Sequence, residues 1–352
     1  MNENNLILQY LKRFLNISLL LLIFLFLGIK VYKNDYNFIW TLLMSIIKCF
    51  TFIFVLVGLH ELSHALMAML FKFRVTNIKI LFIEFDLSNK KVKFNFNFDL
   101  GYCKAYPMSD DKYTLYKYIF HTAIGPIINL IICISTIFII MSIDHKTLSD
   151  YLLILISVSV LLEFLFFIPQ KDAADFSDLQ MIYLLIKKDR RAIHFYKTCL
   201  FQGLNSIGTR PKDFPDEIIV TDLQGMNYSE IPYYLYMSYK YFDLKEYKKV
   251  YGIINFLKEN FKLNNAEFLS FGYILSRLLN KDGNHWISND LNESADSIET
   301  LITRYLIQVD NKEKKHILQT IENYYKEHND GIDQMFHVFI FQVIDTDNEI
   351  VS

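Results

Sequence analysis

Residues 38–71 read FIWTLLMSIIKCFTFIFVLVGLHELSHALMAMLF. Lys48 and the group His60, Glu61 and His64 interrupt an otherwise apolar run. About 20 apolar helical residues are enough to cross the hydrocarbon core of a bilayer. The stretch therefore predicts a membrane-spanning helix that carries two histidines and a glutamate at membrane depth.

Three further apolar stretches, at residues 14–29, about 118–143 and 151–169, predict three further spans. No small-residue cleavage site follows the first stretch, so we interpret it as a retained helix rather than a signal peptide. Of the 352 residues, 52% are hydrophobic and only 21% are charged, which excludes a disordered chain. The net charge of -2 gives no basic field, so no nucleic-acid partner is expected.

Lysines and arginines in the loops indicate how the spans are oriented. The segment between the second and third predicted spans carries nine of them, and the loops on the opposite side carry three. This difference predicts a multi-pass protein of the cell membrane with that segment and both termini in the cytoplasm. A composition rich in Asn, Lys, Ile, Phe and Tyr is typical of bacteria with AT-rich genomes, so a bacterial source is expected.

The cytoplasmic segment predicts a β-hairpin. Apolar residues alternate at period two near both ends of residues 75–98, and Ser88-Asn89-Lys90 predicts the turn between them. A third strand is expected near residues 101–104. The predicted fold is thus a membrane α-helical bundle of about four transmembrane helices with a small β-hairpin insert.

After about residue 190 the composition becomes polar and contains no span, which predicts a soluble, all-α C-terminal domain. Residues 210–215 are interpreted as a loop, and residues 231–263 as two amphipathic helices that resemble one tetratricopeptide unit. The predicted domains are an N-terminal helix with its flanks (1–36), a core with the hairpin at about 75–104 (37–190) and the helical domain (191–352).

His60-Glu61-Leu62-Ser63-His64 is an HExxH pattern. Residues four apart lie about 40° apart around a helix, so both imidazoles face one way and can take two corners of a tetrahedral zinc site. Glu61, beside them, is placed to act as a general base on a water molecule. The alternative is a buried structural polar cluster, but polar groups at membrane depth are costly without a partner, and a metal ion is the simplest one. Four scattered cysteines without a CxxC pair argue against a cysteine zinc site.

A catalytic zinc site needs a third protein ligand. Asp172, Asp175 and Asp178 follow the fourth predicted span, and their spacing alone does not choose among them. Ser177 or Asp178 also suits the N-cap of a helix at residues 179–186. Glu163, inside the fourth span, is a further carboxylate.

The third predicted span carries Gly125-Pro126-Ile127-Ile128-Asn129. A Gly-Pro pair loosens a spanning helix and lets neighbouring helices approach. Asn129 is polar at membrane depth and should face the interior of the bundle. His121, one turn before Gly125, is interpreted as an interfacial histidine rather than a ligand.

These motifs together resemble the site-2 protease family of intramembrane zinc metalloproteases. His60-Glu61-Leu62-Ser63-His64 resembles its HExxH, the segment 125–130 its GPxxN, and Pro169 followed by Ser177-Asp178 its third motif. The likeness covers about residues 38–187. Phe166 stands where the family has an Asn, and Leu179 stands where it has a Gly.

The resemblance implies zinc as cofactor, with His60, His64 and Asp178 as its ligands and Glu61 as the catalytic base. It also implies a membrane-embedded protein or peptide substrate, which adds as an extended strand to the hairpin edge. We further expect Asn129 to hold a substrate carbonyl. The expected activity is that of a zinc metalloendopeptidase cutting in or near transmembrane segments. The alternatives are an inactive membrane scaffold that binds a protein partner through its C-terminal domain and, less favoured because no internal repeat is seen, a transporter.

Overall fold

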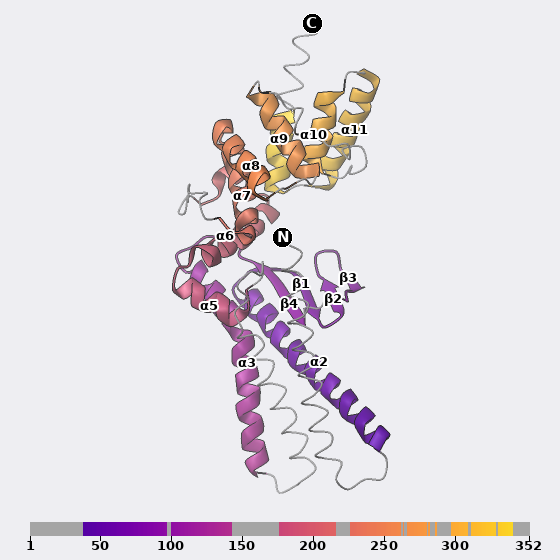
Figure 1. The fold of residues 1–352 in the computed structure, drawn as a ribbon, viewed down its shortest axis with the longest axis vertical. Coiled ribbons are helices and arrows are strands. Elements are labelled where there is room, and N and C mark those ends of the chain that lie inside the picture. The colour runs from indigo at the N-terminus through magenta and orange to yellow at the C-terminus, as the bar shows by residue number, and fades with distance from the viewer. Residues whose placement is uncertain are drawn as a thin grey trace. The chain divides into compact units, whose positions relative to one another are not determined.

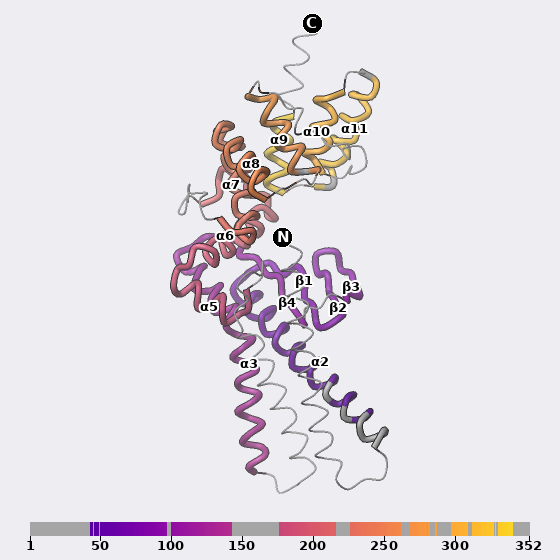
Figure 2. Tube along the Cα trace, in the orientation of Figure 1, coloured from indigo at the N-terminus to yellow at the C-terminus, as the bar shows by residue number. Residues whose placement is uncertain are grey.

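The structure, a computed structural model, describes residues 38–96, 100–142, 176–215, 226–261, 263, 266–279, 281, 286, 297–308, 311–328 and 330–340 (Figures 1 and 2). Its contacts divide the chain into two units. The first comprises residues 1–105 and 115–189, and the second comprises residues 106–114 and 190–352. The spans predicted at residues 14–29 and 151–169 lie outside the described residues.

Two helices of the described part are long and apolar enough to cross a membrane. The segment Ile46–Leu70 of α2 (Phe38–Leu70) has 25 residues, and α3 (Thr114–Ser142) has 29. At a rise of about 1.5 Å per residue, both exceed the hydrocarbon thickness of about 30 Å. They correspond to the second and third predicted spans. The helix α3 begins four residues before the apolar stretch that predicted the third span, after a turn in which the Asp111 carboxylate accepts a hydrogen bond from the Tyr113 backbone N–H.

Large apolar side chains of α2 face outward while its polar residues face inward. Leu59, Leu62 and Leu66 are 44%, 45% and 68% exposed, whereas His60 and His64 are buried. A helix in water normally places its apolar residues inward. The reversed arrangement suits a helix with lipid on its outer face.

A four-stranded sheet follows α2, in the order β3-β2-β1-β4. Its strands are β1 (Arg74–Ile80), β2 (Ile83–Asp86), β3 (Lys91–Phe94) and β4 (Gly101–Tyr106). β1 pairs antiparallel with β2, and β2 pairs antiparallel with β3. The predicted turn at residues 88–90 lies between β2 and β3.

The prediction of a single hairpin over residues 75–98 is wrong in one respect. A second turn at Leu81 and Phe82 divides the expected first strand, so that Ile80 pairs with Ile83. Leu81 adopts a positive φ of 53°, a conformation that L-residues rarely take and that period-two alternation does not reveal. The hairpin is thereby extended into a sheet.

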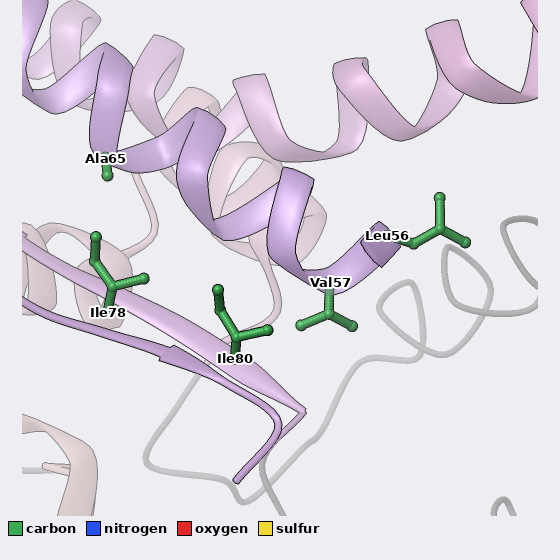
Figure 3. Packing of buried hydrophobic residues seen from close by; sticks show 5 residues of the cluster. All are labelled: Leu56, Val57, Ala65, Ile78 and Ile80. Atoms are coloured by element: carbon green, nitrogen blue, oxygen red, sulfur yellow. The ribbon is translucent and has the colours of Figure 1, made fainter. Parts of the chain in front are cut away.

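The core of the first unit lies between β1 and α2. Ile78 and Ile80 of β1 face Val57 and Ala65 of α2 (Figure 3), and Leu56 completes this buried cluster. Figure 1 shows the sheet beside the C-terminal part of α2, the part that carries the HExxH pattern.

The second unit consists mainly of helices in its described residues. Its helices are α6 (Arg190–Ser206), α7 (Ile231–Asp243), α8 (Tyr247–Phe261), α9 (Ala266–Leu278), α10 (Ile298–Ile307) and α11 (Asn311–Glu327), followed by helical residues 331–340. The two helices predicted within residues 231–263 are confirmed as α7 and α8. The predicted loop at residues 210–215 contains a short 3₁₀ turn, Pro211–Asp213. The tetratricopeptide likeness stays a prediction.

Candidate metal centre

Two imidazoles of α2 converge on one carboxylate. The Nε2 atoms of His60 and His64 lie 3.2 Å apart, which follows from their spacing of one helical turn. Both also approach the Oδ2 atom of Asp178, at 2.9 Å and 3.2 Å respectively. The three side chains thus offer three donor atoms to one point, all within 4.8 Å of one another.

Asp178 is the first residue of α5 (Asp178–Ile186), with Ser177 at its N-cap. Burial alone would raise the pKa of its carboxyl, but the imidazoles of His64 and His60 hold that pKa below its usual range. Of the three aspartates that the sequence left open, the structure brings Asp178 to the histidines. Asp172 and Asp175 lie outside the described residues, as do Glu163, Phe166 and Pro169.

The Nδ1 atoms of both imidazoles have partners on α3. His64 Nδ1 donates to the backbone carbonyl of His121 at 2.7 Å, and His60 Nδ1 lies 3.0 Å from the amide Nδ2 of Asn129. The His121 carbonyl takes the proton of His64 Nδ1, which fixes the orientation of this ring and leaves its Nε2 atom for an ion. Asn129 therefore faces the interior of the first unit, beside His60.

The imidazoles are also close to the backbone of Gly125. A Cβ atom built on this glycine would lie 2.5 Å from His64 Nε2 and 2.6 Å from His60 Nε2. The absent side chain leaves room in front of the two donor atoms. Three convergent donors, two oriented imidazoles and this free space together fit a divalent ion such as zinc.

Glu61 is 5% exposed and lies on the sheet side of the centre. A Cβ atom on Gly101, the first residue of β4, would lie 2.6 Å from its Oε1 atom. The backbone of β4 therefore approaches the carboxylate more closely than any larger residue would permit. A water or peptide near this carboxylate also lies near the edge of the sheet.

Sequence reasoning missed the roles of Gly101 and Gly125 and of the His121 carbonyl. The signal for the α3 contacts was present, because residues 121, 125 and 129 repeat every four positions and so share one helix face. The side chain of His121 is buried, and its two ring nitrogens have no hydrogen-bond partner in the described part of the chain. For Gly101 the sequence offered no signal, since its role depends on where β4 begins.

The fold and this centre define a class: a membrane helical protein whose HExxH helix and a distant aspartate form a candidate zinc site. The family model described as Peptidase family M50 matches residues 48–342, and the chain belongs to this family, the site-2 protease family. Its members are zinc metalloproteases and are generally membrane-associated. The comparisons with curated proteins and with solved structures found no match.

Proposed function

We propose that the protein is an intramembrane zinc metalloprotease that hydrolyses peptide bonds in or near transmembrane segments of a membrane-bound substrate or precursor peptide. The observation that carries this proposal is the convergence of His60, His64 and Asp178 beside Glu61. In this proposal the three convergent residues hold zinc. Zinc supplies Lewis-acid chemistry, which polarises a carbonyl and lowers the pKa of a bound water to about 7.

Glu61 is the general base of the proposed reaction. Its carboxylate takes a proton from the attacking water and passes it to the nitrogen of the leaving amine, so that the peptide bond breaks with no net change of proton number on the enzyme. Burial excludes bulk water from the carboxylate and strengthens its electrostatic interactions with the reacting groups.

The edge of β4 is the proposed docking place for the substrate. β4 is one of the two edge strands of the described sheet, and its first residue lies against Glu61. A peptide in lipid keeps its backbone hydrogen bonds as a helix, so it must unwind before cleavage. Pairing with β4 offers replacement hydrogen bonds next to the catalytic carboxylate.

Asn129 has two proposed roles that one amide group can combine. A His60 that binds zinc through Nε2 carries its remaining proton on Nδ1, and this N–H needs an acceptor. Rotation of the Asn129 amide by half a turn exchanges its nitrogen and oxygen, so that the oxygen faces His60 Nδ1 and accepts this proton. Its NH₂ group is then free to donate to a substrate carbonyl.

The membrane arrangement is part of the proposal. Two candidate spans and the family support a membrane protein. We propose a multi-pass protein of a bacterial cell membrane with both termini in the cytoplasm. Residues 37–190 are the proposed protease core, and residues 191–352 are the proposed helical domain, which binds a protein partner.

The variant Glu61→Gln tests the proposed chemistry. The purified protein, reconstituted with zinc, is incubated with a panel of tagged single-span membrane peptides. Glu61→Gln should keep its zinc, because it leaves the three ligands intact, and should lose about 100-fold or more in cleavage rate. The control Glu259→Gln changes an exposed carboxylate of α8 and should cleave like the parent.

Two outcomes would count against this mechanism. If Glu61→Gln cleaved as well as the parent, Glu61 would not be the base. If the parent bound zinc and cleaved none of the peptides, the alternative of an inactive membrane scaffold, which also agrees with Phe166 and Leu179, would be favoured.

A further inference from the structure

The chain crosses between its two units at three places, and two of these crossings border one short segment, residues 106–114. Residues 106–114 join β4 to α3, two elements of the first unit, yet they belong to the second unit. The metal centre depends on both neighbours, since Gly101 of β4 lies against Glu61, and α3 supports both imidazoles. The 106–114 segment is therefore a link between the second unit and the metal centre.

Two contacts hold the 106–114 segment on α6. The Nζ atom of Lys197 lies 3.4 Å from Asp110 Oδ2, and both side chains are largely buried. One turn and a half further along α6, Gly203 lies against the carbonyl oxygen of Pro107, where a Cβ atom would overlap that oxygen. Glycine weakens a helix relative to alanine. A glycine at position 203 nevertheless allows the segment to approach α6 this closely.

The segment is continuous with α3 through a compact cap. Thr114 Oγ1 accepts a hydrogen bond from the Asp111 backbone N–H and donates one to the Ser109 carbonyl, at 2.9 Å and 3.0 Å. Thr114 is 1% exposed. A shift of the segment therefore moves the start of α3, which lies about 10 Å along the helix axis from His121.

The helix α6 is held at its N-terminal end. It follows α5, which carries Asp178, after a turn in which Lys188 takes a positive φ of 54°. Within the second unit, the buried carboxylate of Glu230 accepts hydrogen bonds from Arg190 Nε at 2.9 Å and His194 Nδ1 at 2.6 Å. Thus one helix is joined by the chain to the element of Asp178 and holds the segment that joins β4 and α3.

We infer that Lys197 and Gly203 are positioning residues of the metal centre, which they affect by holding the 106–114 segment in place. The expected effect on cleavage rests on the proposed function, whereas the expected effects on hydrogen exchange and zinc loss do not. The helical domain thereby gains a direct role, because the state of α6 sets the positions of β4 and α3. A partner bound to this domain would change the activity of the protease core without contacting the core itself.

The test uses the full-length protein in detergent and compares three alanine variants. Gly203→Ala places a methyl group against Pro107. Gly331→Ala places one against the Thr209 carbonyl, inside the second unit and not against Pro107, and Gly252→Ala adds a methyl where nothing lies within 4 Å. The readouts are hydrogen–deuterium exchange of residues 101–105, the rate of zinc loss to a chelator, and kcat and KM on the peptide that the parent cleaves fastest.

Gly203→Ala should increase exchange at residues 101–105, speed zinc loss by about tenfold, and lower kcat by about tenfold or more with a smaller change in KM. Gly331→Ala should weaken the second unit without these three effects, and Gly252→Ala should resemble the parent. The inference is overturned if Gly331→Ala reproduces the effects of Gly203→Ala, or if Gly203→Ala leaves exchange and zinc loss unchanged.

A charge exchange covers the case in which Gly203→Ala does not fold. Lys197→Glu and Asp110→Lys should each loosen the segment, because each places two like charges together. The double variant should restore low exchange at residues 101–105 and slow zinc loss, and a double variant no better than either single one would contradict the inference. If the parent cleaves no peptide, the proposed function fails, whereas exchange and zinc loss still decide this inference.

Discussion

Gly125 shows how one missing side chain shapes the metal centre. The Nε2 atoms of His60 and His64 lie 3.2 Å apart. A methyl group on Gly125 would lie 2.6 Å from the first and 2.5 Å from the second. These distances are far below van der Waals contact. The space in front of the imidazoles therefore exists because residue 125 is a glycine.

Gly125→Ala should lose most of its bound zinc and its cleavage activity while the fold is kept. Alanine in a helix is more favourable than glycine by about 0.5–1 kcal/mol, so α3 itself should not be weakened. Metal content by elemental analysis and helicity by circular dichroism check the two parts. The control Gly252→Ala, on α8, should keep full zinc. Full zinc in Gly125→Ala would show that the ion does not lie where the three ligands point.

The sequence predicted part of this centre for a simple reason. The spacing of four residues brings His60 and His64 together on any regular helix, so their convergence did not depend on the tertiary structure. The selection of Asp178 did depend on it. Asp172, Asp175 and Asp178 are three residues apart, so their spacing did not choose among them, and within the described part of the chain the start of α5 brings the Asp178 carboxylate to the imidazoles.

Among the elements, the β2–β3 hairpin depends on one buried carboxylate. Asp86 accepts hydrogen bonds from the backbone N–H of Asn89 at 2.9 Å, from its side-chain amide at 3.0 Å, and from Lys93 at 3.1 Å. The side-chain and backbone hydrogen bonds from Asn89, followed by Lys93, lower the pKa of Asp86 to about 2. The turn therefore needs this carboxylate in its charged form.

The Asp86→Asn variant should loosen the hairpin at neutral pH but not in strong acid. A pKa below the unfolded value of about 3.9 means that the charged carboxylate stabilises the fold above that pH, and that this contribution is lost as pH falls toward 2. Exchange protection of residues 83–94 should thus differ between parent and variant at pH 6 and converge near pH 2. An equal difference at both pH values would contradict this assignment.

The same sheet shows why element boundaries are hard to predict. Period-two alternation correctly indicated β1, where Ile78 and Ile80 pack against α2. It also indicated β3, although Phe94 of that strand is exposed. The turn at Leu81 and Phe82 contains no glycine, proline or asparagine, so the usual turn signals were absent. Packing of the sheet as a whole, rather than local preference, holds Leu81 at its positive φ.

At the scale of the molecule, the second unit was foreseeable only in part. The shift to polar composition near residue 190 coincides with the division between Asp189 and Arg190. The 106–114 segment carries no such shift, and its place in the second unit arises from contacts with α6, more than 80 residues away in sequence. Long-range contacts of this kind have no local sequence signature.

The proposed orientation in the membrane rests on the distribution of charge. Nine lysines and arginines lie between the second and third predicted spans, against three on the other side, and basic loops are retained in the cytoplasm. We therefore expect a membrane-impermeant maleimide to label Lys91→Cys, on the exposed strand β3, in inverted vesicles but not in intact cells. Lys146→Cys, between the third and fourth predicted spans, should show the opposite pattern, and the parent protein gives the background from its own cysteines. Labelling of Lys91→Cys in intact cells would reverse the orientation and place the sheet, together with the β4 edge proposed for substrate docking, on the outer side of the membrane.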